Sequence, residues 1–190
     1  SEGMIVKTNT PELEKSRRMT LSVITSDHAG DCKAPCYMAC PTHQDIQGYV
    51  GLIANGEEEK ALEIIKKDNP LPMSIGRVCP HPCEEKCRRK HLEGAVSICA
   101  LKRFSAESNV DYIPECKEYN GKKIAIVGAG PAGLSCAYFL AIEGYRAEIF
   151  ESEEKGGGML RYGIPAYRLP KDILDKEIEK KEAKLQKMNK

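Results

Sequence analysis

Hydrophobic positions near the start of the chain predict a short strand followed by a helix. The apolar run at residues 4–8 predicts the strand. Residues 10–31 predict the helix, because Thr10 is a suitable N-cap and Pro11 suits the first turn. The apolar positions of this helix are Leu13, Met19, Leu21 and Ile24.

The middle of the chain predicts three more helices and a linker. Residues 45–72 predict two helices interrupted near Asn55-Gly56, and residues 96–108 predict another. The polar segment 109–122 is expected to be a linker. The side chains expected to face a core from the first two of these helices are Val50, Leu52, Ile53, Leu62, Ile64 and Ile65.

After the linker the pattern changes to strand, glycine loop, helix and strand over residues 122–151. Cys136 lies within this helix, and we expect its side chain to be packed against other residues. The closing segment 173–190 is rich in charged residues and predicts a helix with a solvated face. The first strand is expected to be buried and parallel, through Ile124, Ile126 and Val127.

The glycine loop, GAGPAG, predicts a dinucleotide site. Gly128 permits the tight turn, Gly130 lets the backbone approach a pyrophosphate, and Gly133 lets the helix pack on the strand. The helix N-terminus offers amide donors and the positive end of a dipole to phosphates. Glu151 closes the second strand, about 20 residues on, where a carboxylate can bind ribose hydroxyls. The alternative is a glycine turn in an ordinary α/β core.

Composition adds that the chain is nearly neutral and rich in cysteine. Its 29 Lys and Arg against 28 Asp and Glu leave a net charge of +1, so no whole-molecule argument supports nucleic-acid or membrane binding. No apolar run approaches the ~20 residues of a membrane helix, and the first residues lack the apolar region of a signal peptide. We therefore expect a cytoplasmic protein, in which 9 cysteines indicate metal or redox chemistry rather than disulfides.

Six of the cysteines form two matched runs in which a cysteine stands at every fourth position: Cys32, Cys36, Cys40, and Cys79, Cys83, Cys87. Proline follows Cys40 and Cys79, as it follows a ligand cysteine in ferredoxins. Zinc sites more often use close CxxC pairs, which this chain lacks. The pattern favours iron–sulfur clusters, with zinc or inert thiols as the alternatives.

Three segments resemble a known family: residues 34–56, 69–89 and 94–104. They are similar to the N-terminal domain of the glutamate synthase small subunit and its relatives, which include dihydropyrimidine dehydrogenase and NADPH-linked ferredoxin oxidoreductases of anaerobes. The resemblance covers roughly residues 20–170. It implies a mainly α, helical domain with two [4Fe-4S] clusters, followed by a partial α/β, Rossmann-like FAD-binding domain.

The resemblance also implies ligands for a first cluster. The matching cysteines are Cys40, Cys79 and Cys83. The fourth ligand in the family comes from the following helix and can be a non-cysteine such as Gln or Glu. The matching residue here is Lys102, a poor ligand. Cys99 lies three residues earlier on the same helical face, and we expect it to substitute. The alternative is that Cys99 is a buried small hydrophobe.

For the second cluster, Cys36 and Cys87 match directly. The family pattern has two further cysteines upstream, whereas this chain has only Cys32, displaced by one residue. His28 and Cys116 are candidates for the remaining ligand. The alternative for His28 is a polar surface residue.

FAD rather than NAD follows from the resemblance of GAGPAGL and of the segment that begins with Gly156 to the family's FAD-binding sequences. The alternative for residues 162–170 is a surface loop. The residues expected to contact the nucleotide or flavin are Gly128, Gly130, Pro131, Ala132, Gly133, Glu151, Gly157, Gly158, Met159, Leu160 and Arg161.

The expected organisation is a leading remnant or linker at 1–20, the two-cluster domain at 21–118 and the first part of the FAD domain at 119–190. The start resembles the junction behind a [2Fe-2S] ferredoxin domain in hydrogenase- and formate-dehydrogenase-type flavoproteins. We therefore interpret the chain as a fragment of a longer NAD(P)H-dependent oxidoreductase. A naturally short subunit completed by a partner is the alternative.

The expected function is electron transfer between FAD and the clusters, feeding a partner subunit of glutamate synthase, hydrogenase or formate dehydrogenase type. The cofactors carry the electrons, so no catalytic residue is assigned, and this chain alone is expected to be inactive. The alternatives are a zinc-stabilised interaction module with a structural nucleotide site, and a glutamate synthase small subunit proper.

Overall fold

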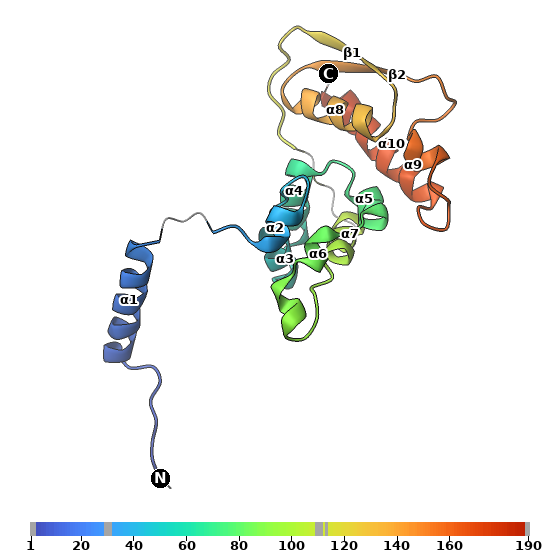
Figure 1. Ribbon diagram of the computed structural model, residues 1–190. Helices are drawn as coiled ribbons and strands as arrows, with labels where there is room; N and C mark the ends of the chain where they lie inside the picture. The colour runs from blue at the N-terminus through green and yellow to red at the C-terminus, as the bar shows by residue number, and fades with distance from the viewer. Residues whose placement is uncertain (1–2, 29–31, 109–111, 113, 189–190) are drawn as a thin grey trace. The chain divides into compact units, whose positions relative to one another are not determined.

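The computed structural model describes residues 3–28, 32–108, 112 and 114–188, with side chains as far as residue 179 (Figure 1). The chain divides into two compact units, Ser1–Lys33 and Ala34–Lys190. None of the described helices is both long and apolar enough to cross a membrane. Each unit is taken in turn.

The first unit contains a single described helix, α1 (Pro11–Ser26). The predicted cap is confirmed: Thr10 Oγ1 accepts a hydrogen bond from the backbone N–H of Leu13 at 3.3 Å, and proline occupies the first turn. The predicted strand at 4–8 is wrong, because these residues lack a paired strand within the unit. The helix ends before the predicted residue 31, and residues 29–31 lie outside the described part. Its large apolar side chains are all exposed within the described residues: Leu13, Met19, Leu21, Val23 and Ile24.

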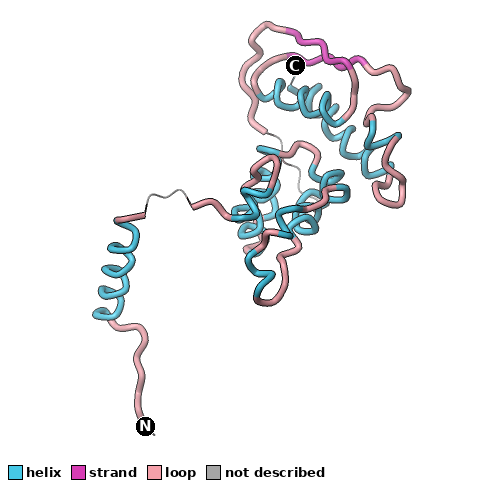
Figure 2. Tube along the Cα trace, in the orientation of Figure 1, coloured by secondary structure: helices cyan, strands magenta, loops and turns pink. Residues whose placement is uncertain are grey.

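The second unit opens with a set of short helices (Figures 1 and 2). They are α2 (Pro35–Ala39), α3 (Ile46–Ala54), α4 (Glu58–Asp68), α5 (Pro72–Val78), α6 (Pro82–Glu85), the 3₁₀ helix η1 (Arg88–His91) and α7 (Ile98–Glu107). The predicted break at Asn55-Gly56 is confirmed, and Gly56 has the left-handed φ of +73° that glycine adopts without strain.

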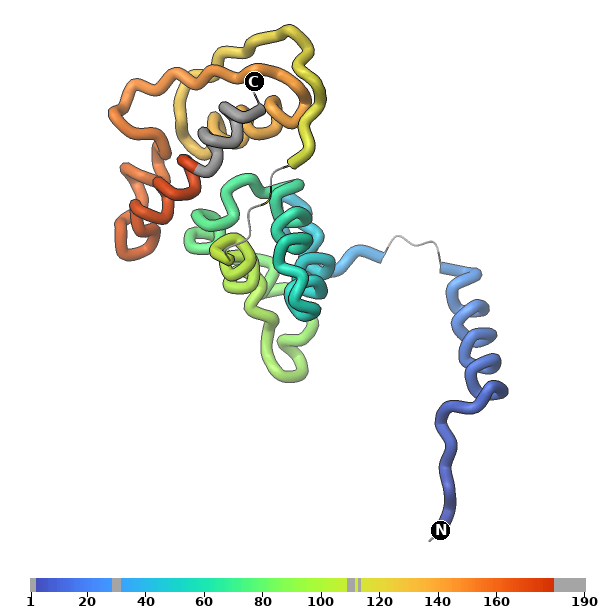
Figure 3. Tube along the Cα trace, turned by 180° about the vertical axis from the view of Figure 1, so that it is seen from behind, coloured from blue at the N-terminus to red at the C-terminus, as the bar shows by residue number. Residues whose placement is uncertain are grey.

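The core of this helical part forms between α3 and α4, which pack side by side (Figure 3). Its buried members are Ile46, Tyr49, Ala61, Ile65, Cys83 and Ile98. The predicted core positions Val50, Leu52, Ile53 and Ile64 are partly buried against it. Two cysteines of the first run, Cys36 and Cys40, also pack on this core. The cysteines therefore surround an apolar centre.

The rest of the second unit is an α/β arrangement. It comprises β1 (Lys123–Val127), α8 (Pro131–Ile142), β2 (Arg146–Phe150), α9 (Met159–Tyr162) and α10 (Lys171–Met188). The strands are parallel, with Ile126 opposite Ile149 and Val127 opposite Phe150. A Cβ on Gly133 would clash with the backbone oxygen of Gly128, so the close helix–strand packing expected there is present.

Two burial predictions in this part are wrong. Val127 is 92% exposed, because alternate strand residues point to opposite faces and α8 covers only one of them (Figure 1). Cys136 is exposed on α8, on the same helix face as the exposed Phe139 one turn on. The closing helix α10 has exposed residues such as Lys176 and Glu179, as predicted, and buries Leu174 and Ile178 on its other side.

A second core joins the helical and α/β parts. Leu71, which immediately precedes α5, packs with Leu134 of α8 and with residues of the closing segment. The buried carboxylate of Glu177, on α10, accepts hydrogen bonds from the backbone N–H groups of Met73 (2.7 Å) and Ser74 (2.9 Å). These contacts fix α5, which ends at Cys79, against α10. The remaining members of this core are Leu160, Leu169, Leu174 and Ile178.

Candidate cluster and nucleotide sites

Cysteines stand at the ends of the short helices. Cys40 and Cys79 are the C-caps of α2 and α5. The proline after each has no N–H to continue a helix, so the chain turns away there. Cys87 is the N-cap of η1, while Cys83 and Cys99 lie in the first turns of α6 and α7. The helix boundaries thereby bring thiols from separate elements toward one another.

Three of these thiols, from α5, α6 and α7, form what we call the inner thiol group: Cys79, Cys83 and Cys99. The Cys79 and Cys99 side chains interact with each other, and Cys83 interacts electrostatically with both. Cys83 and Cys99 are buried. The backbone N–H of His81 donates to Cys79 Sγ at 3.3 Å, and His81 reaches this position through a left-handed φ of 45°. The structure therefore brings together three of the four ligands predicted for the first cluster.

Cys40, the fourth predicted member, shares neighbours with the inner thiol group. Its Sγ lies 3.4 Å from the Thr42 hydroxyl. Both Cys40 and the inner thiol group interact electrostatically with Lys102, and both act on the buried Tyr49. Tyr49 is 1% exposed and belongs to the same apolar core as Cys83, on which Cys40 also packs.

The surroundings shift the pKa values of these thiols in different directions. Burial raises the pKa of Cys83 to about 11 and that of Cys99 to about 12. Burial also acts to raise the pKa of Cys40, but hydrogen bonds from Thr42 and Gln44 outweigh it and the pKa is lowered. A coordinating metal deprotonates a thiol outright, so ligation here would release protons.

Cys36 and Cys87 form a second pair. Their side chains interact electrostatically, and burial raises the pKa of Cys36. Both line a cavity of about 270 Å³ whose walls also include Ile46, Val50 and Ile98. The structure thus brings together the two ligands that match the second cluster directly, beside an apolar hollow.

The other candidates for the second cluster lie elsewhere. His28 and Cys32 belong to the first unit, where His28 Nε2 lies 3.0 Å from Cys32 Sγ. Cys116 is in the linker, where its thiol donates to Pro114 O at 3.4 Å and interacts electrostatically with Tyr138. The structure therefore does not group Cys116 with Cys36 and Cys87.

No three His, Cys, Asp or Glu side chains among the described residues are placed to hold a single metal ion. The thiols are instead distributed around Tyr49 and the cavity beside Cys36. A cluster of several irons is larger than one ion, and its cysteines approach from different sides. The donor set, thiols of separate helices on an apolar core, fits such a cluster.

Sequence reasoning missed Glu84 and Tyr49, and it treated Lys102 only as a poor ligand. Glu84, next to Cys83, accepts a hydrogen bond from the backbone N–H of Cys99 at 2.8 Å, so its carboxylate caps the start of α7. Glu84 lies inside the second cysteine run and could not be paired with α7 from sequence, because the loop and 3₁₀ helix of residues 86–97 intervene.

The glycine loop between β1 and α8 has the backbone expected of a phosphate site. Gly128 takes a φ of +96°, and Gly130 is the N-cap of α8, with Pro131 in its first turn. Gly157 N–H donates to Ala129 O at 2.8 Å. A Cβ on Gly158 would come within 2.8 Å of Gly130 Cα. The second predicted glycine segment therefore lies directly against the first.

Glu151 is anchored to the same loop. Its carboxylate accepts hydrogen bonds from the backbone N–H groups of Ala129 (2.7 Å), Ser152 (2.8 Å) and Glu153 (3.0 Å). The Glu153 N–H, followed by that of Ala129, lowers the pKa of Glu151. The carboxylate is thus held charged beside the glycine loop.

Residues 159–161 are divided between surface and core. Met159 is exposed, whereas Leu160 is buried in the core shared with α10. Arg161 donates from Nε to Gly156 O at 2.6 Å and forms an ion pair with Asp175. The pair lowers the pKa of Asp175. Arg161 therefore links the glycine segment to α10. Another predicted contact residue, Ala132, is exposed at the start of α8.

Two family models match the chain. Residues 8–112 match the model described as dihydropyrimidine dehydrogenase domain II, 4Fe-4S cluster, and residues 126–171 match that of an NAD(P)-binding Rossmann-like domain. The first match covers more than half of the chain. It contains both cysteine runs and Cys99, while the second contains the glycine loop and Glu151.

Curated relatives are oxidoreductase subunits. The chain is 47% identical over 152 residues to the NADPH-Fe(3+) oxidoreductase subunit beta of Geobacter sulfurreducens, covering 77% of this chain and 23% of that protein. It is 44% identical over 171 residues to the NADP(+)-dependent formate dehydrogenase subunit beta of Moorella thermoacetica, covering 77% and 24%. It is 35% identical over 161 residues to the glutamate synthase [NADPH] small chain of Escherichia coli, covering 81% and 34%. The chain thus spans about a quarter to a third of the length of these relatives.

Proposed function

The chain belongs to the dihydropyrimidine dehydrogenase domain II family of 4Fe-4S cluster proteins, and on this premise we propose that it relays electrons between FAD and two [4Fe-4S] clusters. The relatives named above are subunits of oxidoreductases, several of them named for NADPH or NADP(+). We place this chain in the electron-transfer portion of such an enzyme, feeding a partner subunit.

One cluster is assigned to Cys40, Cys79, Cys83 and Cys99. The observation that carries the proposal is the inner thiol group, in which three thiols from three helices interact beside a buried tyrosine. Such a cluster, when bound, takes up and releases one electron. The chain supplies four thiolates, the N–H of His81 toward one sulfur, and an apolar wall that limits water.

A second cluster is assigned to Cys36 and Cys87, with Cys32 and His28 as the remaining ligands. The pair and the cavity beside it support this assignment. The short distance between His28 and Cys32 supports treating these two as a pair.

FAD is assigned to the glycine loop and the segment against it. The loop from Gly128 to Gly133 would hold the diphosphate at the start of α8, and Glu151 would bind a ribose hydroxyl. The contact of Gly157 and Gly158 with the loop supports a site built from both predicted segments. The matching family model names NAD(P), so the choice of FAD rests on the resemblance of these segments.

The proposed partner is an oxidoreductase subunit of hydrogenase or formate dehydrogenase type, with the glutamate synthase large subunit as the second choice. Identity is 47% and 44% to two beta subunits, and 35% to the glutamate synthase small chain. Purification of the complex from its source, followed by identification of the associated subunit, decides between them.

Metal analysis of anaerobically reconstituted protein tests the proposal. We expect iron and acid-labile sulfide equivalent to two clusters, with a broad visible absorption that dithionite bleaches. Cys99→Ala should alter or remove one cluster, seen as a change in one EPR signal. Cys136→Ala is the matched control, because this thiol is exposed and lies outside both cysteine groups. Stoichiometric zinc without sulfide, or unchanged iron and EPR in Cys99→Ala, would contradict the assignment.

A further inference from the structure

Lys102 is a buried lysine in the part of the molecule that carries the thiols. It lies in α7, and only 6% of its surface is exposed. Lysine is almost never this buried unless it is paired, because removing an ammonium group from water is costly. The ion pairs formed by the described residues do not include Lys102. Its charge therefore has to be matched by another kind of group.

Three thiols lie within electrostatic reach of Lys102, those of Cys40, Cys83 and Cys99. Lys102 follows Cys99 by three residues, so both lie on one side of α7. This helix packs against several others. Among them are α3, which contains Tyr49, α5, which is followed by Cys79, and α6, which contains Cys83. Lys102 thus lies near three of the four ligands assigned above.

We infer that Lys102 is a positioning residue whose fixed positive charge raises the reduction potential of the cluster held by Cys40, Cys79, Cys83 and Cys99. The inference rests on the proposed function, since it requires that cluster. Each reduction adds one electron to the cluster, from reduced flavin in the proposed function and from dithionite in the test. No bond is made or broken at Lys102.

The sign follows from electrostatics. Four thiolates make the site negative, and the added electron makes it more negative. A nearby cation stabilises the reduced form more than the oxidised form, so reduction becomes easier. The interaction is strong because Lys102 is buried, where screening by water and salt is weak. A lysine of this kind also offsets the cost of burying the thiolates.

The test replaces Lys102 with methionine, which keeps most of the length and apolar volume but removes the charge. Midpoint potentials are measured by EPR-monitored redox titration of the reconstituted chain. We expect Lys102→Met to bind the same iron and sulfide, with one midpoint shifted to more negative potential and the other unchanged. Lys102→Arg should stay close to the unaltered chain, because it retains the charge.

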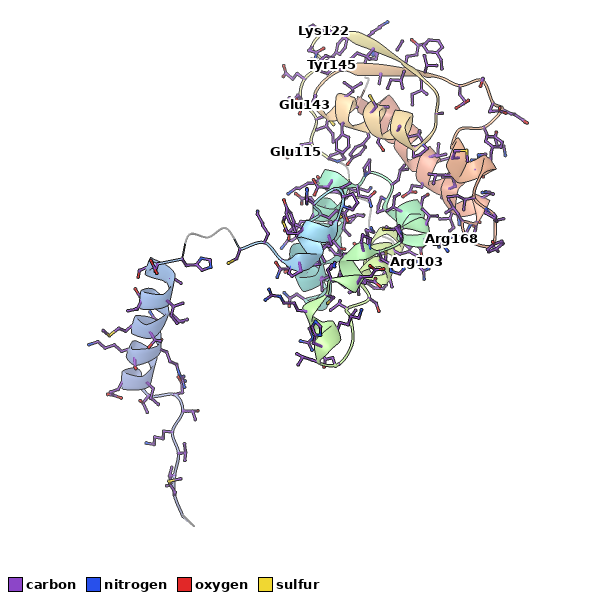
Figure 4. All side chains as sticks on the ribbon, in the orientation of Figure 1. Arg103, Glu115, Lys122, Glu143, Tyr145 and Arg168 are labelled. Carbon is purple, nitrogen blue, oxygen red and sulfur yellow. The ribbon has the colours of Figure 1, made fainter. Side chains whose placement is uncertain are left out.

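Arg103→Met is the matched control. It removes the same charge one residue away on α7, but Arg103 is exposed and pairs with Glu107 at 3.8 Å, so solvent screens it (Figure 4). Its midpoints should not move. Equal midpoints in Lys102→Met and the unaltered chain would overturn the inference while leaving the proposed function intact.

Two further outcomes are distinguishable. If Lys102→Met cannot assemble the cluster, Lys102→Leu takes its place against Lys102→Arg, and a negative shift in the Leu variant alone supports the charge effect. If the Met, Leu and Arg variants all fail while Arg103→Met assembles, Lys102 is needed for folding and the inference is wrong. If the unaltered chain binds no iron and sulfide, the proposed function itself fails, and this inference with it.

Discussion

Gly133 shows how a single missing side chain sets the geometry of the nucleotide loop. A Cβ at this position would clash with the backbone oxygen of Gly128 and would also crowd Ile126. Neither group can withdraw easily, because Gly128 holds the tight turn and Ile126 belongs to β1. The close approach of α8 to β1 therefore depends on glycine at residue 133.

Gly133→Ala should destabilise the chain by about 3 kcal/mol, since overpacking against backbone is costly. Urea unfolding followed by circular dichroism measures it. Gly51→Ala is the control, because Gly51 lies within α3 and its Cβ would meet nothing within 4 Å. That change should stabilise the chain by about 0.5–1 kcal/mol. Equal stability of the two variants would show that α8 can shift away from the strand at little cost.

At the residue scale, the sequence identified candidate ligand residues better than it predicted which neighbouring residues are buried beside them. The family resemblance, together with the helical spacing of Cys99 and Lys102, predicted Cys99 near Cys79, and the two side chains interact in the structure. The burial of Lys102 could not be predicted in this way, because it depends on how α3, α5 and α6 meet α7. A charged residue three positions from a cysteine is common in sequences, and only the packing of other helices shows whether it is buried.

At the scale of elements, the structure attaches α5 to α10 through one buried carboxylate. Glu177 accepts hydrogen bonds from the N–H groups of Met73 and Ser74, at the start of α5. Those donors have no partner within the helix, and a negative charge is favourable at this end of it. Because α5 ends at Cys79, the closing helix holds an element that carries a proposed cluster ligand.

Glu177→Gln should reduce the free energy of unfolding by about 2 kcal/mol, because a hydrogen bond to a charged group is replaced by a weaker neutral one. The amide also presents donors to the N–H groups that the carboxylate satisfied. Glu179→Gln is the control, since Glu179 is exposed on the same helix and should change stability by less than about 0.5 kcal/mol. If the two variants unfold at the same urea concentration, the buried contact contributes little.

Local signals predicted the elements well wherever the chain itself fixes the conformation. Thr10 with Pro11 located the start of α1, and Asn55-Gly56 located the break between α3 and α4. The prediction failed at residues 4–8 because a strand needs a partner strand, which a short apolar run does not supply. The two cysteine runs and the glycine loop are local patterns that the sequence shows directly, whereas the assignment of each cysteine to a cluster comes from the family resemblance and stays a prediction.

At the scale of the whole molecule, the face of the sheet that the described residues do not cover carries one apolar pair. The sheet consists of β1 and β2, and Val127 and Phe150 stand opposite each other with 92% and 54% of their surfaces exposed. The other pairs on this face are Lys123 with Arg146 and Ala125 with Glu148. The sequence predicted a buried Val127, because the apolar run of β1 is also the pattern of a strand buried on both faces. Exposed apolar faces and open strand edges promote association.

We therefore expect the 190-residue chain to self-associate through this face. Val127→Lys places a charge on the face without touching the side of the sheet that packs on α8, and it should shift the chain toward monomer. Leu92→Lys is the matched control, because Leu92 is 82% exposed after η1, away from the sheet. Sedimentation velocity over a range of concentrations measures both variants against the unaltered chain. A monomer at all concentrations, or equal dissociation by both variants, would show that the sheet face does not drive association, because only Val127 lies on it.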